Sequence, residues 1–148
     1  MQLELFTHKP STMQLYRGIL AGVTKRFQLT QMQLDILLFL ANNPQYDTAR
    51  DLVEVRHLSK SHVSAAVEDL VQRGFLQRQQ KAGNKKLIHL CLLPEADAAV
   101  QAGQAAQHDF FDQLFVGFTP DERTLLTALL SRVETNAEEA FHRLEHQP

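Results

Sequence analysis

The stretch that decides the fold is LSKSHVSAAVEDLVQRGFL, residues 58–76. Val63, Val67 and Leu70 recur at the spacing of one helical side, with Ala66 beside them. The opposite side of the helical wheel carries small and polar residues: Ser61, Ala65, Glu68 and Gln72. We therefore predict an amphipathic helix that buries its valine side.

Both ends of this helix are marked in the sequence. Ser59 is a residue type that caps helix starts, and Gly74 is one that ends helices. After Gly74 the period changes to that of strands, over residues 75–79 and 86–92. In the second strand Ile88, Leu90 and Leu92 alternate with His89 and Cys91. The polar residues 81–85, KAGNK, suit the tip of a hairpin.

Further helices are predicted on both sides of this segment. Residues 13–27 have helical apolar spacing, and residues 30–33 and 48–51 have the pattern of capped helix starts. The third and fourth helices are joined by only a few residues, 56–58. Downstream, Pro94 opens a long helical segment, and Thr119 followed by proline and two acids starts the last helix.

The predicted fold is mainly α with a small β-hairpin. A tight pair of helices followed at once by a hairpin is a winged helix-turn-helix, in which the hairpin is the wing. We assign residues 30–93 to this lobe and residues 1–29 and 94–148 to flanking helices.

Composition sets limits on location and chemistry. The chain has 148 residues, 44% of them hydrophobic, which is ordinary for one globular domain. No apolar run approaches the roughly 20 residues that span a bilayer, no signal peptide is visible, and there is one cysteine. We expect a cytoplasmic protein with no membrane partner.

Charge is distributed unevenly along the chain. Residues 48–91 carry eight Lys or Arg against four Asp or Glu, whereas residues 92–148 carry three against ten. The net charge of −2 therefore hides a basic middle segment, which is the part that would meet double-stranded DNA.

Only the first turns of a recognition helix reach base edges. The predicted DNA-binding residues are Lys60, Ser61, His62, Ser64 and Ala65 on this helix, and Lys81, Lys85 and Lys86 at the wing tip.

Residues 29–37, 48–52 and above all 58–76 resemble the MarR family of bacterial transcriptional regulators. The resemblance implies a homodimer whose terminal helices interlock and whose two recognition helices and wings bind a palindromic operator. It also implies a regulator, most simply a repressor, that responds to an effector. The wing departs from the family pattern because it has lysines where the family has an arginine with an orienting aspartate. We therefore expect phosphate contacts from this wing more than minor-groove reading.

Other patterns suggest less specific roles. The pairs His142 with His146 and His108 with Asp112 have a metal-binding spacing, but no further ligands lie near in sequence, so we predict no metal and no cofactor. Cys91 is more simply structural than redox-active. The aromatic stretch at 110–118 fits a dimer core, or else the wall of a pocket for a small-molecule effector.

No phosphate-binding glycine loop, nucleophile elbow or zinc-binding helix motif occurs, so we predict no enzymatic activity. The alternative function is a helical interaction module, or a small-molecule-binding protein that kept the fold without binding DNA. The negative net charge favours that alternative.

Overall fold

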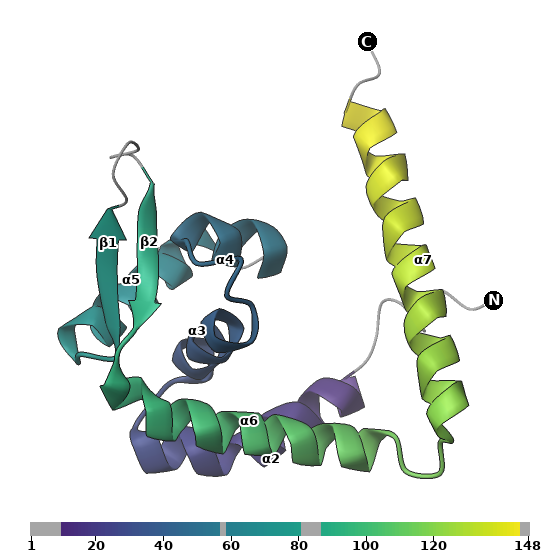
Figure 1. The fold of residues 1–148 in the computed structure, drawn as a ribbon, viewed down its shortest axis with the longest axis horizontal. Helices are drawn as coiled ribbons and strands as arrows, with labels where there is room; N and C mark the ends of the chain where they lie inside the picture. Colours follow the sequence, from purple (N-terminus) through teal and green to yellow (C-terminus); the bar gives the residue numbers. More distant parts are fainter. Residues whose placement is uncertain (1–9, 57–58, 81–86, 146–148) are drawn as a thin grey trace. The chain divides into compact units, whose positions relative to one another are not determined.

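The computed structural model describes residues 10–56, 59–80 and 87–145. The elements in chain order are α2 (Pro10–Phe27), α3 (Gln31–Asn42), α4 (Ala49–Arg56), α5 (Lys60–Gln72), β1 (Leu76–Gln80), β2 (Ile88–Leu92), the short 3₁₀ helix η1 (Pro94–Ala96), α6 (Asp97–Leu114) and α7 (Pro120–Glu145). The described residues up to Phe111 form one compact unit, and those from Asp112 form a second. Figure 1 shows the helices and the two-stranded hairpin of the predicted winged helix-turn-helix, so the predicted fold class is confirmed.

Local hydrogen bonds start α3, α4 and α7 as the sequence predicts. Thr30 Oγ1 accepts a hydrogen bond from the Gln33 backbone N–H, and the Gln33 side chain accepts one from the Thr30 backbone N–H. Thr48 and Asp51 repeat this reciprocal pair at α4. Thr119 and Glu122 do the same at α7. Each pair satisfies two backbone donors that the first helical turn would otherwise leave unpaired.

The two ends of α5 differ from each other. Ser59 occupies the N-cap position, as predicted, but its side chain makes no cap hydrogen bond. Its Oγ instead lies 3.0 Å from Oγ of Ser61. At the other end Gly74 adopts φ +75°, and the Phe75 N–H donates to the Leu70 carbonyl. A positive φ costs little conformational free energy only for glycine. The predicted end of the helix at Gly74 is therefore confirmed.

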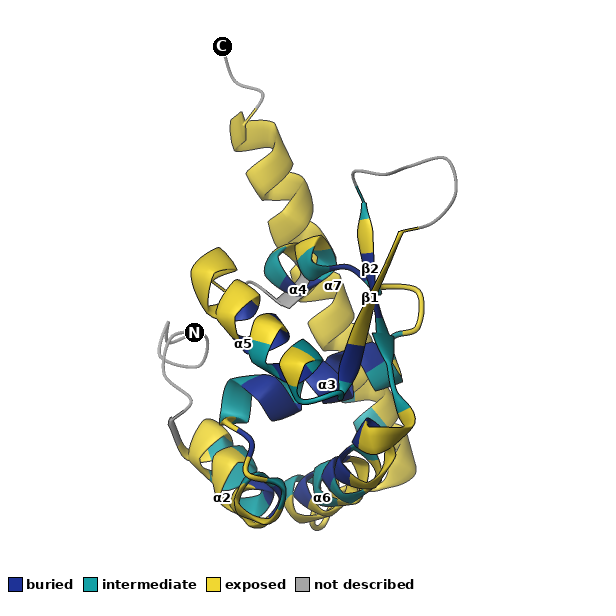
Figure 2. Cartoon of the chain, turned by 90° about the vertical axis from the view of Figure 1, so that its left-hand side faces the viewer, coloured by how far each residue is buried: buried dark blue, intermediate teal, exposed yellow. Residues whose placement is uncertain are grey.

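The core of the first unit is built around α3. Leu34, Ile36, Leu37 and Leu38 of α3 are fully buried, and the helix is mostly dark blue in Figure 2. The valine side of α5 packs on it, as predicted. Helix α6 approaches α3 closely at Gly103, where an added Cβ would lie 2.8 Å from a methyl group of Leu38.

The hairpin is antiparallel and pairs Leu76 with Leu92 at its base. The predicted alternation holds only in part, because His89 is buried and Ile88 is 41% exposed. His89 Nδ1 lies 2.6 Å from Oδ1 of Asp47, and the Leu90 N–H donates to the Asp47 carbonyl. The segment before α4 thus covers His89 and joins β2 of the wing to the helical core.

Helix α7 has no buried residue in the single chain. Its exposed large apolar side chains are Leu125, Leu129, Leu130, Val133, Phe141 and Leu144, each 45–66% exposed. Exposed apolar area of this extent on one helix is typical of an interface.

Candidate nucleic-acid interface and effector pocket

The first two turns of α5 present the predicted contact residues to solvent. Lys60, Ser61, His62, Ser64 and Ala65 are all exposed, whereas Val63 between them is 1% exposed. Figure 2 shows the exposed outer side of α5 against the buried α3. Burial of Val63, Ala66, Val67 and Leu70 fixes this orientation, because rotating the helix would expose all four.

The wing lies next to α5 in the fold. The first strand packs on α5, and its residues from Gln77 to Gln80 are exposed. The wing-tip residues Lys81, Lys85 and Lys86 lie outside the described residues, and their part of the predicted interface stays a prediction.

Two arginines beside α5 were missed by the sequence analysis. Arg78 of β1 donates to Glu68 of α5 over 2.9 Å, and Arg50 of α4 donates to Glu54 over 2.7 Å. Hydrogen bonds from Arg78 and Gln72 hold the pKa of Glu68 below its ordinary value, and Glu54 raises the pKa of Arg50. The Arg50–Glu54 pair was detectable from its spacing of four residues. The Glu68–Arg78 pair was not, because it joins a helix to a strand.

A cavity of about 590 Å³ lies between α4, α5 and the hairpin. Its lining includes both arginines, Lys60 and Ser64, with Val63 and Leu90 at its apolar side. The charged side chains of α4, α5 and β1 at this place therefore share one concave surface.

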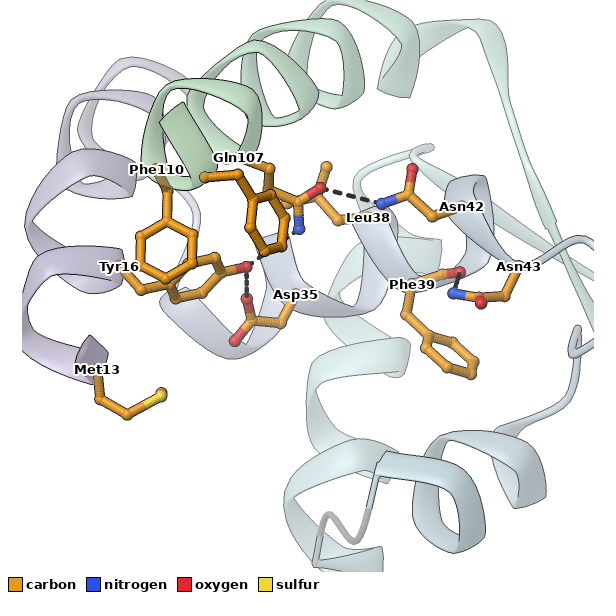
Figure 3. Close-up of a pocket in the computed structure, with 10 residues that line it drawn as sticks. Met13, Tyr16, Asp35, Leu38, Phe39, Asn42, Asn43, Gln107 and Phe110 are labelled. Atoms are coloured by element: carbon orange, nitrogen blue, oxygen red, sulfur yellow. Dashed lines mark hydrogen bonds between the residues drawn. The ribbon is translucent and has the colours of Figure 1, made fainter. Parts of the chain in front are cut away.

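A second cavity, of about 270 Å³, lies between α2, α3 and α6 (Figure 3). Tyr16 OH donates to Asp35 over 3.1 Å and accepts from the Gln107 amide over 3.2 Å. Phe110 packs edge-to-face on Tyr16 with 5.3 Å between ring centroids, and Phe111 also lines the cavity. An aromatic wall with a few polar groups is typical of small-molecule sites. Two residues of the aromatic stretch, Phe110 and Phe111, therefore line this cavity.

A polar network joins the far end of α5 to α2 and α3. Asp69 accepts from the buried Gln33 amide over 2.6 Å and lies 3.6 Å from Arg73. Arg73 donates to the backbone carbonyls of Phe27 and Gln28, both over 2.9 Å, and lies over the Phe75 ring. The end of α2 is thereby tied to the end of α5.

The remaining candidates gain no support from the structure. Within residues 10–56, 59–80 and 87–145, no three His, Cys, Asp or Glu side chains group closely enough to hold a metal ion. His146 lies outside the described residues, and Cys91 is half-buried. No helix in the described part of the chain has the length and apolar character that a membrane crossing requires.

Sequence comparison identifies one family. The sequence model of the MarR family matches residues 27–86, which run from the last residue of α2 past β1 and end before β2. A search of curated protein sequences gives no match.

Solved structures share the fold. A MarR family protein from Listeria monocytogenes, crystallised with 26mer DNA, superposes with TM-score 0.72 at 20% identity, over 89% of this chain and 90% of that one. The apo form of MarR from E. coli gives TM-score 0.64 at 21% identity, over 90% and 97%. BpsR from Bordetella bronchiseptica, whose DNA binding is regulated by 6-hydroxynicotinic acid, gives TM-score 0.64 at 19% identity, over 84% and 88%. The resemblance carried by residues 58–76 is therefore confirmed: the chain matches the MarR family in sequence over residues 27–86 and has the fold of its transcriptional regulators.

Proposed function

We propose that this protein is a transcription regulator that binds double-stranded DNA with α5 as its recognition helix. The observation that carries the proposal is the exposed face of α5 formed by Lys60, Ser61, His62, Ser64 and Ala65. It lies beside a wing whose first strand belongs to the segment that matches the MarR family. The DNA-bound Listeria structure shows that one protein of this fold binds DNA. We assign the base-reading role to Ser61, Ser64 and Ala65 and phosphate contacts to Lys60, His62, Lys81, Lys85 and Lys86.

We also propose that the protein acts as a homodimer. The apolar side chains of α7 need a partner, and a second copy of this helix offers a matching surface. A dimer with two-fold symmetry would place two recognition helices about one DNA turn apart, on a palindromic operator. A dimer that covers such an operator excludes other proteins from it, which makes repression the simplest mode of action.

The cavity between α2, α3 and α6 is the proposed effector site. It touches α3, which packs against the recognition helix, and α2 and α6, which belong to the proposed dimerisation region. A ligand that fits one spacing of the two recognition helices better than another would shift the population between DNA-binding and non-binding dimers. The lining favours a small aromatic compound that carries a hydrogen-bonding group.

Selection from a randomised duplex library at two salt concentrations tests the DNA-binding function. A palindromic motif with half-sites about one turn apart is the expected result. If folded protein retains nothing above background at the lower salt, DNA binding is wrong and the interaction-module alternative is favoured.

Two substitutions in α5 should have different effects on DNA binding. Ser64→Ala is expected to change base preference within each half-site by about 1 kcal/mol, because it removes a hydrogen bond to a base edge. Lys60→Ala should weaken binding to every sequence and lower the salt slope by about 1 for each protomer, because it removes a phosphate contact. Affinities for operator and mutated duplexes across a salt series check both. Equal loss on every sequence for Ser64→Ala would contradict base readout.

Tyr16→Phe tests the effector pocket. The substitution removes the hydroxyl that donates to Asp35 and accepts from Gln107 and leaves the ring in place. A panel of small aromatic acids and phenols, screened by the shift in Tm, should contain compounds that bind the wild type. Their affinity for Tyr16→Phe should be about tenfold weaker, because one polar group is lost from a partly buried site. Unchanged affinity would place the ligands elsewhere.

A further inference from the structure

The ion pair Glu68–Arg78 joins the proposed recognition helix α5 to the first strand of the wing. Arg78 Nη2 lies 2.9 Å from Glu68 Oε2, and Gln72 Nε2 donates to Glu68 Oε1 over 3.2 Å. Both oxygens of the carboxylate are therefore hydrogen-bonded. The side chains are 38% and 51% exposed for Arg78 and Glu68, so water and other anions can reach them.

Arg78 belongs to the surface on which we place DNA. It lines the same cavity as Lys60 and Ser64, two of the proposed contact residues of α5. A free guanidinium at this position would bind a phosphate through two parallel hydrogen bonds. With Glu68 in place the pair has no net charge, and Arg78 contributes no counterion release when DNA binds.

We propose that Arg78 is a further phosphate-binding residue and that Glu68 competes with DNA for its guanidinium. This inference rests on the proposed DNA-binding function. An exposed ion pair is weak, so a phosphate can displace the carboxylate, but the displacement lowers the affinity for every sequence alike. Glu68 thus limits nonspecific binding while base contacts from the first turns of α5 keep the operator preferred.

The ionisation state of Glu68 supports this competition. Its hydrogen bonds with Arg78 and Gln72 lower the pKa of the carboxyl group, so it remains charged across the neutral range. The neighbouring pair Arg50–Glu54 has a different arrangement, because both of its residues lie on α4, one turn apart.

The test is the affinity for a nonspecific duplex of fixed length, measured across a salt series. At about 0.1 M salt, Glu68→Gln should bind the duplex about threefold to tenfold more tightly than wild type. Its plot of log affinity against log salt concentration should be steeper by about 0.9 for each protomer. Glu68→Ala, which removes the acceptor altogether, should give the same result. In the background Arg78→Gln, Glu68→Gln should change the affinity less than about twofold, because the released cation is gone.

A matched control separates this effect from net charge. Glu139→Gln in α7 removes the same charge and frees Arg143, which lies 4.0 Å from Glu139. It should leave the salt slope unchanged. Equal tightening by Glu68→Gln with and without Arg78 would overturn the inference, since it would show simple repulsion by the carboxylate. An unchanged slope in both Glu68 variants would overturn it too. If the wild type binds no DNA at low salt, the proposed function itself fails, and that outcome is distinct from these.

Discussion

Leu130→Glu combined with Val133→Glu is expected to make the protein monomeric and to weaken its binding to a two-half-site operator more than about 100-fold. Both side chains are nearly half exposed in the single chain, on a helix with no buried residue. In a dimer formed through α7 the new carboxylates would be buried without partners, which strongly disfavours association. A monomer then binds each half-site separately and loses the high effective concentration of its second recognition helix. Sedimentation equilibrium and operator titration measure the two effects.

Thr135→Glu is the matched control for this double substitution. Thr135 is exposed on the same helix, and at 100° per residue it lies nearly opposite Leu126 and Leu144. The added charge should leave both the dimer and its DNA affinity unchanged. A double variant that remains dimeric at micromolar concentration would show that α7 is not the dimer interface.

The parts of the fold that depend on neighbouring residues were predictable from the sequence. The reciprocal caps at Thr30, Thr48 and Thr119 each involve residues three apart, and the buried side of α5 follows from a period of 3.6. The left-handed turn at Gly74 is equally local. Where a distant partner intervenes, the prediction failed. His89 was expected opposite the apolar side of its strand, but Asp47, 42 residues away, buries it.

The candidate site shows the same division. The exposed face of α5 was predictable because burial of Val63 and Val67 determines which residues face solvent. The cavity beside Tyr16 was not, because its polar groups come from three helices: Asp35 lies 19 and Gln107 lies 91 residues from Tyr16. No spacing pattern in the sequence indicates that these three side chains come together in the fold. Glu68 was correctly placed on the outer side of α5, yet its bond to Arg78 required the position of β1.

Arg73→Ala is expected to lower the free energy of unfolding by about 2–3 kcal/mol, because it removes two charge-assisted hydrogen bonds. The guanidinium bridges the carbonyl of Phe27, the last residue of α2, and that of Gln28, the residue after it. A helix leaves its last carbonyls without partners inside the helix. Its stacking on Phe75 and its contact with Asp69 are lost as well. Urea unfolding monitored by circular dichroism gives the value. Arg73→Lys should recover only part of it, since an ammonium group cannot match the planar fork of the guanidinium.

Arg50→Ala is the control for this effect. Arg50 forms an exposed ion pair with Glu54 within α4, so its loss should leave stability nearly unchanged. A loss of unfolding free energy for Arg73→Ala no larger than that for Arg50→Ala would show that the bridge to α2 contributes nothing to stability.

The Arg73 bridge also bears on DNA binding. Helix α5 is held at this end by Arg73 and by the Asp69–Gln33 bond, which together connect the proposed recognition helix to α2 and α3. Folded Arg73→Ala should therefore bind the operator more weakly than wild type at low temperature, with an unchanged salt slope. That combination arises when a helix is less firmly positioned while its phosphate contacts are retained.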